Sequence, residues 1–134
     1  MRRTLIFFLV ILFSLNPVLA ERGEGNKLLE QCKGVIRTID TNDYANADQF
    51  GSGICFGYVN GSRDAYGLSV GALKYAGTYD NEVTKILLPC IPEQVQVIQL
   101  ARILVKYLES HPEELHEDDA FLVRRAFVKA FPCK

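Results

Sequence analysis

The apolar residues between positions 27 and 39 recur with the spacing of an amphipathic helix. They lie three or four positions apart and so share one helical face, at Leu28, Leu29, Cys32, Val35, Ile36 and Ile39. Asn26 precedes them and is a residue type favoured as an N-cap. The polar run from Thr41 to Asp43 would end the helix. This pattern predicts a helix over 27–39 with one buried stripe.

A second helix is expected over 53–76, a stretch that contains no proline. Gly53, Gly57 and Gly61 recur every four positions, so they lie in one row on that helix. Each glycine costs about 1 kcal/mol of helix stability relative to alanine. This repeated cost indicates that another backbone packs closely there, either inside the chain or across a two-fold axis. Gly77 would end the helix.

A third helix is expected from Ile91-Pro92-Glu93, because proline at the first helical position and a neighbouring acid both favour a helix start. His111-Pro112 would end it, since the residue before proline avoids the helical region. The preceding connection, 78–89, has an exposed tip at 79–82, and its apolar run 86–88 is expected to pack down.

A fourth long helix follows the acidic residues 117–119, whose carboxylates complement the positive end of a helix dipole. A single turn at 112–115 precedes it. The apolar stripe of this last helix comprises Ala120, Val123, Phe127, Ala130 and Phe131. Together these patterns predict an all-α domain of four to five helices.

The first twenty residues have the features of a secretory signal peptide. Two arginines follow Met1, residues 5–13 are apolar, and Ala20 is a small residue at the expected cleavage position. An uncleaved anchor is the alternative, but the apolar run is shorter than the roughly 20 residues that span a bilayer. We therefore expect cleavage after Ala20, export, and one mature domain over 21–134 that is not held in a membrane.

The mature chain would carry 13 basic and 16 acidic side chains, a net charge of −3, because residues 1–20 contain only two arginines and no acid. That balance does not favour a nucleic-acid partner. All four cysteines, Cys32, Cys55, Cys90 and Cys133, lie in the exported part, where disulfides are expected. Their spacing is too wide for a zinc knuckle.

The disulfide pairing can be argued from the helix order. Cys90 precedes the third helix and Cys133 follows the fourth. A short connection makes these two helices antiparallel, so both cysteines would lie at the same end of the hairpin. This arrangement favours Cys90 with Cys133 and leaves Cys32 with Cys55.

Catalytic chemistry is not apparent. His111 and His116 do not share a helical face and lack a third spaced metal ligand. The acidic residues 113–119 have no evident apolar surroundings that would raise a carboxyl pKa, so a solvated turn is the simpler interpretation. We therefore expect a binding protein without enzymatic activity, metal or cofactor.

Three segments resemble the Tai-type family of type VI secretion amidase immunity proteins. They are CFGYVNGSRDA (55–65), LPCIPEQVQVIQLARILVKYLESHPEEL (88–115) and AFLVRRAFVKAFPC (120–133). The combination of Cys-x-Gly-Tyr-Val-x-Gly, Cys-x-Pro, Tyr-Leu-x-x-His-Pro-Glu and Phe-Pro-Cys carries the resemblance. It implies a helical, disulfide-bonded protein of the bacterial periplasm, often a homodimer, that blocks the active-site cleft of a cognate peptidoglycan amidase.

Two segments are candidates for contact with such an amidase. The first is the loop tip Tyr79, Asp80, Asn81 and Glu82, which offers an aromatic anchor and carboxylates that could pair with a catalytic histidine. The second is the acidic turn with Glu113, Glu114 and Glu117. An ordinary solvated loop is the alternative for both. For the whole protein, an acid-stress chaperone or a small-ligand carrier of the periplasm is the alternative function.

Overall fold

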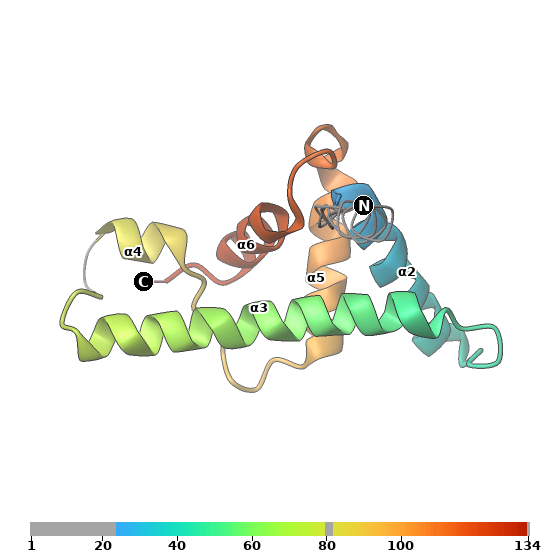
Figure 1. Cartoon of the computed structure of the whole chain (residues 1–134), viewed down its shortest axis with the longest axis horizontal. Helices are drawn as coiled ribbons and strands as arrows, with labels where there is room; N and C mark the ends of the chain where they lie inside the picture. The colour runs from blue at the N-terminus through green and yellow to red at the C-terminus, as the bar shows by residue number, and fades with distance from the viewer. Residues whose placement is uncertain (1–23, 80–81, 134) are drawn as a thin grey trace, which may run out of the picture.

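The computed structural model describes residues 24–79 and 82–133, which form an all-α fold (Figure 1). Its elements in chain order are α2 (Gly25–Thr41), α3 (Gln49–Tyr75), α4 (Glu82–Leu87), α5 (Val97–Ser110), the 3-10 turn η1 (Pro112–Glu114) and α6 (Asp119–Ala130). The described residues contain no strand, only an isolated bridge between Glu24 and Asp118. The predicted all-α class is confirmed, whereas the expected signal peptide lies outside the described residues.

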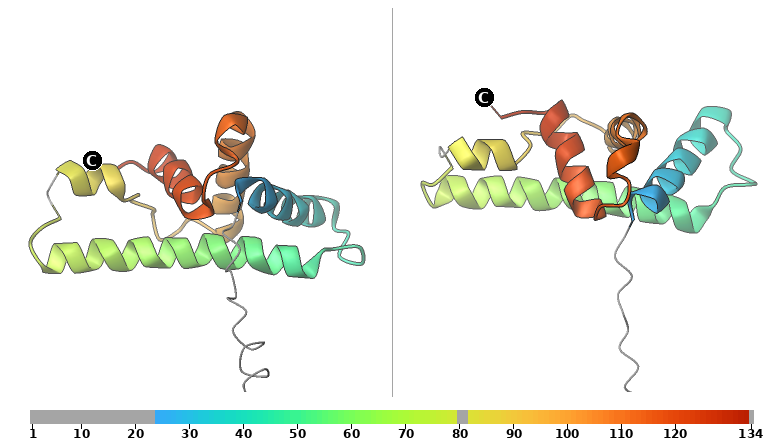
Figure 2. Two further views of the ribbon diagram at one scale, coloured as in Figure 1. Left: turned by 45° about the horizontal axis from the view of Figure 1, so that its top comes forward. Right: turned by 90° about the horizontal axis from the view of Figure 1, so that it is seen from above.

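The long helix α3 forms one layer, and the other helices lie along one of its sides (Figures 1 and 2). Helix α5 is central, because it packs against α2, α3 and α6. The fully buried side chains come from these four helices and include Cys32, Cys55, Val59, Leu100, Leu104, Leu108, Leu122, Val123 and Phe127. The core therefore lies around α5 and involves mainly the first half of α3, with Tyr66 of the second half partly buried against it.

Local sequence signals fix several helix ends. Asn42 ends α2 in the left-handed conformation with φ 56°, and Gly77 follows α3 with φ 68°. The side chain of Asp48 caps α3 by accepting a 2.9 Å hydrogen bond from the Gly51 backbone nitrogen. Asp118 caps α6 in the same way through the Ala120 nitrogen at 2.9 Å. The helix ends predicted at Gly77 and His111-Pro112 are confirmed.

Three predicted helix starts are wrong. Helix α3 begins at Gln49, four residues before the expected Gly53, because Asp48 caps it. Helix α2 begins at Gly25 with Glu24 at the N-cap, and the Asn26 side chain instead donates to the Leu115 carbonyl at 3.3 Å. Helix α5 begins at Val97, six residues after Ile91. The segment before it, 91–96, is non-helical and contains a turn in which the Val95 nitrogen donates to the Pro92 carbonyl at 3.1 Å.

The predicted backbone approach at Gly53, Gly57 and Gly61 is wrong within the chain. A Cβ placed on any of the three would meet nothing within 4 Å. The reason is that α3 packs inward through Cys55 and Val59, on its opposite face. A close approach occurs instead at Gly25, where a Cβ would collide with Leu122 and lie 3.0 Å from the Leu115 carbonyl oxygen.

Both expected disulfides are present. Cys32 joins Cys55 with the Cα atoms 5.1 Å apart, and Cys90 joins Cys133 with the Cα atoms 5.0 Å apart. The first bond links α2 to α3 inside the core. The second links the chain before α5 to the chain after α6. The stripe predicted for the last helix is correct at Val123 and Phe127, but Leu122 and Ala126 replace the exposed Ala120 and Ala130.

Candidate functional site

The second half of α3 and the following residues extend beyond the core as an arm, which we define as residues 66–79 and 82–91 (Figure 1). The buried residues of α3 are Gly51, Cys55 and Val59, all in its first half. Helix α4 has no buried residue. A segment that contributes so little to the core is available for binding a partner.

The arm is held to the body at a few defined points. The Tyr79 hydroxyl lies 3.1 Å from Cys90 Sγ, and Cys90 is bonded to Cys133. The ammonium of Lys74 lies 4.9 Å from the centre of the Tyr79 ring, a cation–π contact. The ring of Tyr79 is therefore half-buried against the disulfide and does not project from the loop tip.

Helix α4 adds exposed apolar side chains to those that α3 presents on the arm. Val83, Ile86 and Leu87 are 57%, 65% and 46% exposed. The prediction that the run 86–88 packs down is therefore wrong for Ile86 and Leu87, and only Leu88 is half-buried. In the sequence a short exposed apolar run has the same pattern as a buried segment, so the pattern does not reveal this surface. Asp80 and Asn81 lie outside the described residues, and Glu82 begins α4 as an exposed residue.

A cleft of about 770 Å³ lies between the second half of α3 and the chain at 89–93. Leu68, Val70 and Ile91 supply its apolar lining, and Arg63, Lys74 and Glu93 supply charges. Arg63 donates to the Val95 carbonyl at 3.1 Å, which ties α3 to the start of α5. The lining combines apolar and charged side chains, a composition suited to binding a ligand or a partner.

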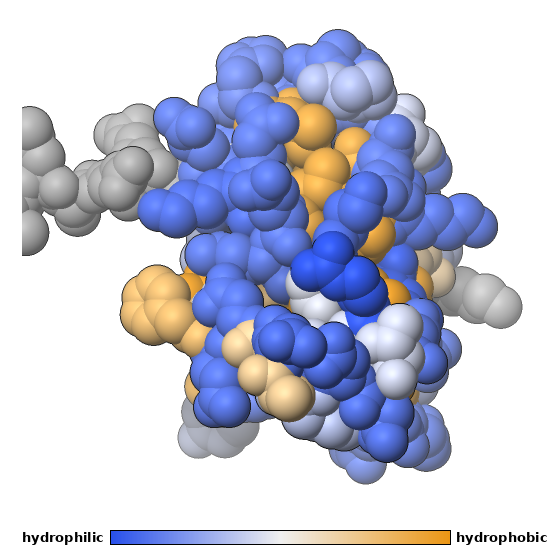
Figure 3. Space-filling model, turned by 90° about the vertical axis from the view of Figure 1, so that its right-hand side faces the viewer, coloured by the Kyte–Doolittle hydropathy of each residue, from blue (hydrophilic) through white to orange (hydrophobic). Residues whose placement is uncertain are grey.

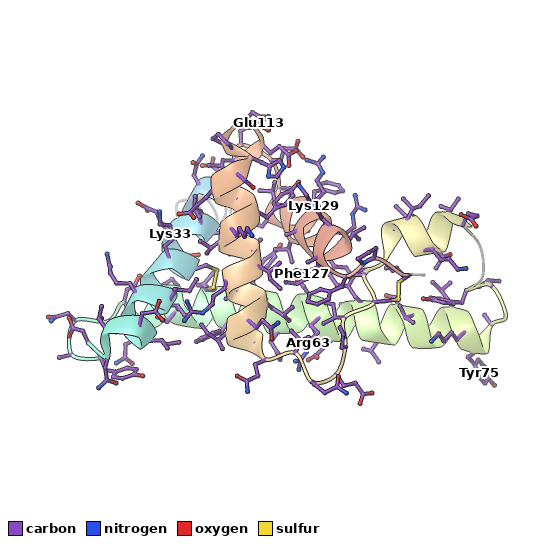
Figure 4. The ribbon with its side chains drawn as sticks, turned by 180° about the vertical axis from the view of Figure 1, so that it is seen from behind. Lys33, Arg63, Tyr75, Glu113, Phe127 and Lys129 are labelled. Atoms are coloured by element: carbon purple, nitrogen blue, oxygen red, sulfur yellow. A yellow bond between two sulfur atoms is a disulfide. The ribbon has the colours of Figure 1, made fainter. Side chains whose placement is uncertain are left out.

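The acidic turn is occupied mainly by contacts inside the protein. Glu114 accepts hydrogen bonds from the Tyr107 hydroxyl at 2.8 Å and from Arg125 at 3.0 Å. Arg125 also pairs with Glu117 at 2.9 Å. The hydrogen bond from Tyr107 is the main reason that the pKa of Glu114 lies below its ordinary value. Glu113 is the exposed acid at the tip of the turn (Figure 4).

Asp119 corrects the expectation that no carboxyl of this turn has its pKa raised. It is only 7% exposed, and its Oδ1 has no hydrogen-bond partner. Burial, reinforced by the nearby charge of Asp118, raises the pKa of the Asp119 carboxyl. Burial is also the first cause of the raised pKa of Tyr58, with Asp119 the next contributor.

Among the residues that the structure describes, no group of three or more His, Cys, Asp or Glu side chains is arranged to hold a metal ion. His111 instead caps the end of α5, stacked on the Tyr107 ring with centroids 4.1 Å apart and its Nδ1 2.7 Å from the Tyr107 carbonyl oxygen. Over the same described ranges, no helix combines the length and apolar content needed to cross a membrane.

The end of the molecule opposite the arm is covered mainly by hydrophilic residues, with hydrophobic ones visible between them (Figure 3). A cavity of about 260 Å³ lies there, lined in part by Val35, Ile39, Tyr44 and Phe56. It is about a third of the volume of the cleft beside the arm. The cleft beside the arm is therefore the larger of these two cavities.

Comparison with known proteins gives one match. Residues 24–133, which include the arm, both disulfides and the acidic turn, match the model of the family described as Rap1a immunity proteins. No curated protein and no solved structure matches the chain significantly. The match covers all the helices described above.

Proposed function

Because the chain belongs to the Rap1a immunity protein family, a family of type VI secretion immunity proteins, we propose that it neutralises one cognate effector in the periplasm. The immunity class expected from the resemblance is confirmed by the match. We further propose that the effector is a peptidoglycan amidase and that this protein covers its active-site cleft. Such an inhibitor acts by steric exclusion of the peptide substrate and needs no catalytic group of its own.

The observation that carries the proposal is the disulfide-anchored arm. Its helix α4 exposes Val83, Ile86 and Leu87, while Tyr79 and the Cys90–Cys133 bond hold its base. Apolar side chains on a pre-ordered segment bind with a smaller loss of conformational entropy than the same side chains on a flexible loop. An arm of this kind is suited to entering a cleft on another protein.

The charge next to these apolar residues supports the same partner. Glu82 is exposed at the start of α4, directly beside Val83. A carboxylate on an inserted segment can pair with a protonated histidine of a cysteine amidase and thereby favour binding in the catalytic cleft. Glu113, on the acidic turn, is a second exposed carboxylate, so we propose it as a peripheral contact.

A small-ligand carrier is the alternative that a specific observation favours, since the 770 Å³ cleft has the volume of a ligand site. Arg63, Lys74 and Glu93 line that cleft, so its ligand would be a charged, amphipathic molecule. The immunity proposal requires no ligand there.

We also propose that the mature protein is a homodimer, as the resemblance implies.

The test is inhibition of the amidase encoded beside this gene. Oxidised protein, residues 21–134, is titrated against cleavage of a peptide crosslink, and the mixture is passed over a sizing column. We expect stoichiometric inhibition with a stable complex and a Kd of about nanomolar order. The paired substitution of Ile86 and Leu87 by aspartate should weaken inhibition by at least about 100-fold, because two apolar contacts are lost.

Phe121→Asp is the matched control, because Phe121 is 56% exposed on α6, away from the arm. Inhibition that survives the α4 substitutions would place the contact elsewhere, and the double substitution of Tyr79 and Asp80 by alanine then tests the preceding loop. Absence of both a complex and inhibition would contradict the amidase proposal. Binding of a charged amphipathic ligand by the same sample would then support the carrier.

A further inference from the structure

Eight positions of α3 form a continuous exposed line along the helix. They are spaced alternately by four and three residues, which is the spacing of a coiled-coil seam, and comprise Phe50, Ile54, Gly57, Gly61, Asp64, Leu68, Gly71 and Tyr75. We call these positions the α3 seam. Its large apolar members are 77% (Phe50), 38% (Ile54), 76% (Leu68) and 98% (Tyr75) exposed.

Nothing in the described part of the chain packs on this seam at its glycines. A Cβ built on Gly57, Gly61 or Gly71 meets no atom within 4 Å. The other described helices lie on the opposite side of α3, so none of them covers this long side of the helix (Figure 2). Tyr75 points away from the body at the end of that rod (Figure 4).

The composition of α3 is unusual for a helix with a solvent-facing side. Its 27 residues include three charged ones, Arg63, Asp64 and Lys74, whereas the 12 residues of α6 include four. A surface helix normally carries charged residues on its outer face. Depletion of charge together with exposed aromatic and aliphatic residues is the composition of a protein interface.

The order of large and small residues along the seam identifies what covers it. The alternating intervals of four and three residues occur in the same order in both directions along the helix. Two copies of the seam can therefore align antiparallel, about a two-fold axis between Gly61 and Asp64. In that register Leu68 faces the partner's Gly57, Ile54 faces the partner's Gly71, and Phe50 faces the partner's Tyr75. Each aliphatic side chain then fills the space above a glycine, which gives the close packing of protein interiors.

A parallel two-fold arrangement does not give this fit. Each residue would then face its own copy, so leucine would meet leucine and glycine would meet glycine. The first pairing separates the helices and the second leaves voids, and each lost contact costs binding energy. Near the axis, Asp64 brings a negative charge, but Arg63 Nε lies 3.6 Å from its carboxylate and reduces that charge locally.

We propose that the α3 seam is the interface of an antiparallel homodimer, in which Leu68 of each chain packs over Gly57 of the other. This interface specifies the homodimer of the proposed function but does not depend on the effector. At 1.5 Å per residue the seam is about 37 Å long, so a helix about 11 Å wide covers roughly 400 Å² per chain. This area belongs to the class of weak interfaces, and we expect a Kd in the micromolar range.

The test is the mass of the mature, oxidised protein in the absence of effector, measured by sedimentation equilibrium from about 1 to about 500 µM, which brackets a micromolar Kd. We expect a reversible monomer–dimer equilibrium. Leu68→Glu should raise the dimer Kd by at least about 10-fold, because each dimer contains the substitution twice. Phe121→Glu, equally exposed on α6, should leave it unchanged. Both side chains are solvent-exposed, so both variants should keep the wild-type helical circular dichroism.

The register has its own test. In the proposed dimer, Gly57 and the partner's Leu68 are opposite each other, whereas the two copies of Gly57 are about 16 Å apart along the axis. A mixture of Gly57→Cys and Leu68→Cys proteins should therefore crosslink with a short bis-maleimide, and each variant alone should not. Crosslinking of the single variants instead would overturn the antiparallel register.

Two results would overturn the interface itself. One is a monomer at every concentration, and the other is a dimer that Leu68→Glu leaves intact. If the protein is monomeric and Leu68→Glu abolishes inhibition of the effector, the seam binds the effector and not a second copy. Failure of the dimer with inhibition intact leaves the proposed function standing, so the two proposals can be judged separately.

Discussion

The hydroxyl of Tyr79 lies 3.1 Å from the sulfur of Cys90, so an aromatic side chain between α3 and α4 rests on the disulfide that closes the domain. This contact joins the base of the arm to the chain terminus, because Cys90 is bonded to Cys133. The disulfide therefore has two roles in this structure. It restricts the unfolded chain, and it fixes the position of the segment that we propose enters the effector.

The two disulfides should have different effects when removed. By the loop-entropy relation, replacing Cys90 and Cys133 by alanine should lower the free energy of unfolding by about 4 kcal/mol, and replacing Cys32 and Cys55 by about 3.4 kcal/mol before packing losses. Urea unfolding measures both. The Cys90/Cys133 variant should also lose inhibition while still folded, because its arm is no longer anchored. Equal inhibition by both folded variants would contradict the anchoring role.

The phenol of Tyr107 should ionise at a higher pH than an ordinary tyrosine. Burial and the hydrogen bond to Glu114 raise the pKa of Tyr107 to about 12. Because the folded state favours the protonated phenol, its stabilisation is present below the ordinary pKa of 10.0 and is lost as the pH rises towards 12. The pKa values of Tyr58 and Tyr66 are also raised, so absorbance at about 295 nm should show several phenols that ionise above the ordinary pKa, and Tyr107→Phe should remove the one that ionises at the highest pH. The same variant should lose about 1.5 kcal/mol of stability at neutral pH, since a hydrogen bond to a carboxylate is lost.

Asp119 should lower stability at neutral pH. Burial raises its pKa, so the folded state favours the protonated carboxyl, and this stabilisation is lost as the pH rises through the folded pKa. Asp119→Asn removes the buried charge and should raise the free energy of unfolding at pH 7 by about 1 kcal/mol. Glu113→Gln is the control, because Glu113 is an exposed acid on the neighbouring turn. Destabilisation by Asp119→Asn would show that the carboxylate has a partner in solution.

The glycines should separate into two classes. Gly25→Ala should destabilise the fold by about 1–3 kcal/mol, because its methyl group collides with Leu122 beside a backbone carbonyl. Gly57→Ala has open space and should stabilise α3 by up to about 1 kcal/mol. Thermal unfolding at dilute, monomeric concentration measures both. A destabilising Gly57→Ala at that concentration would mean that the chain itself covers the seam.

The sequence alone determined the features that depend on local chemistry. The 3.6-residue periodicity of Leu28, Cys32 and Val35 predicted α2, and Gly77 and His111-Pro112 marked helix ends, because these effects act within a few residues. Two cysteines at the same end of a helical hairpin were enough to suggest Cys90–Cys133. The acidic cap of α6 followed from the helix dipole in the same way.

The tertiary structure decided which face of each helix is covered. The glycine row of α3 lies outward because Cys55 and Val59 pack on the other side, and periodicity alone cannot choose between two such faces. Ile86 and Leu87 are exposed because α4 lies beyond the core, and Asp119 is buried because α2 and α6 meet there. Burial depends on contacts between residues distant in sequence. For that reason the arm and the α3 seam became visible only in the folded chain.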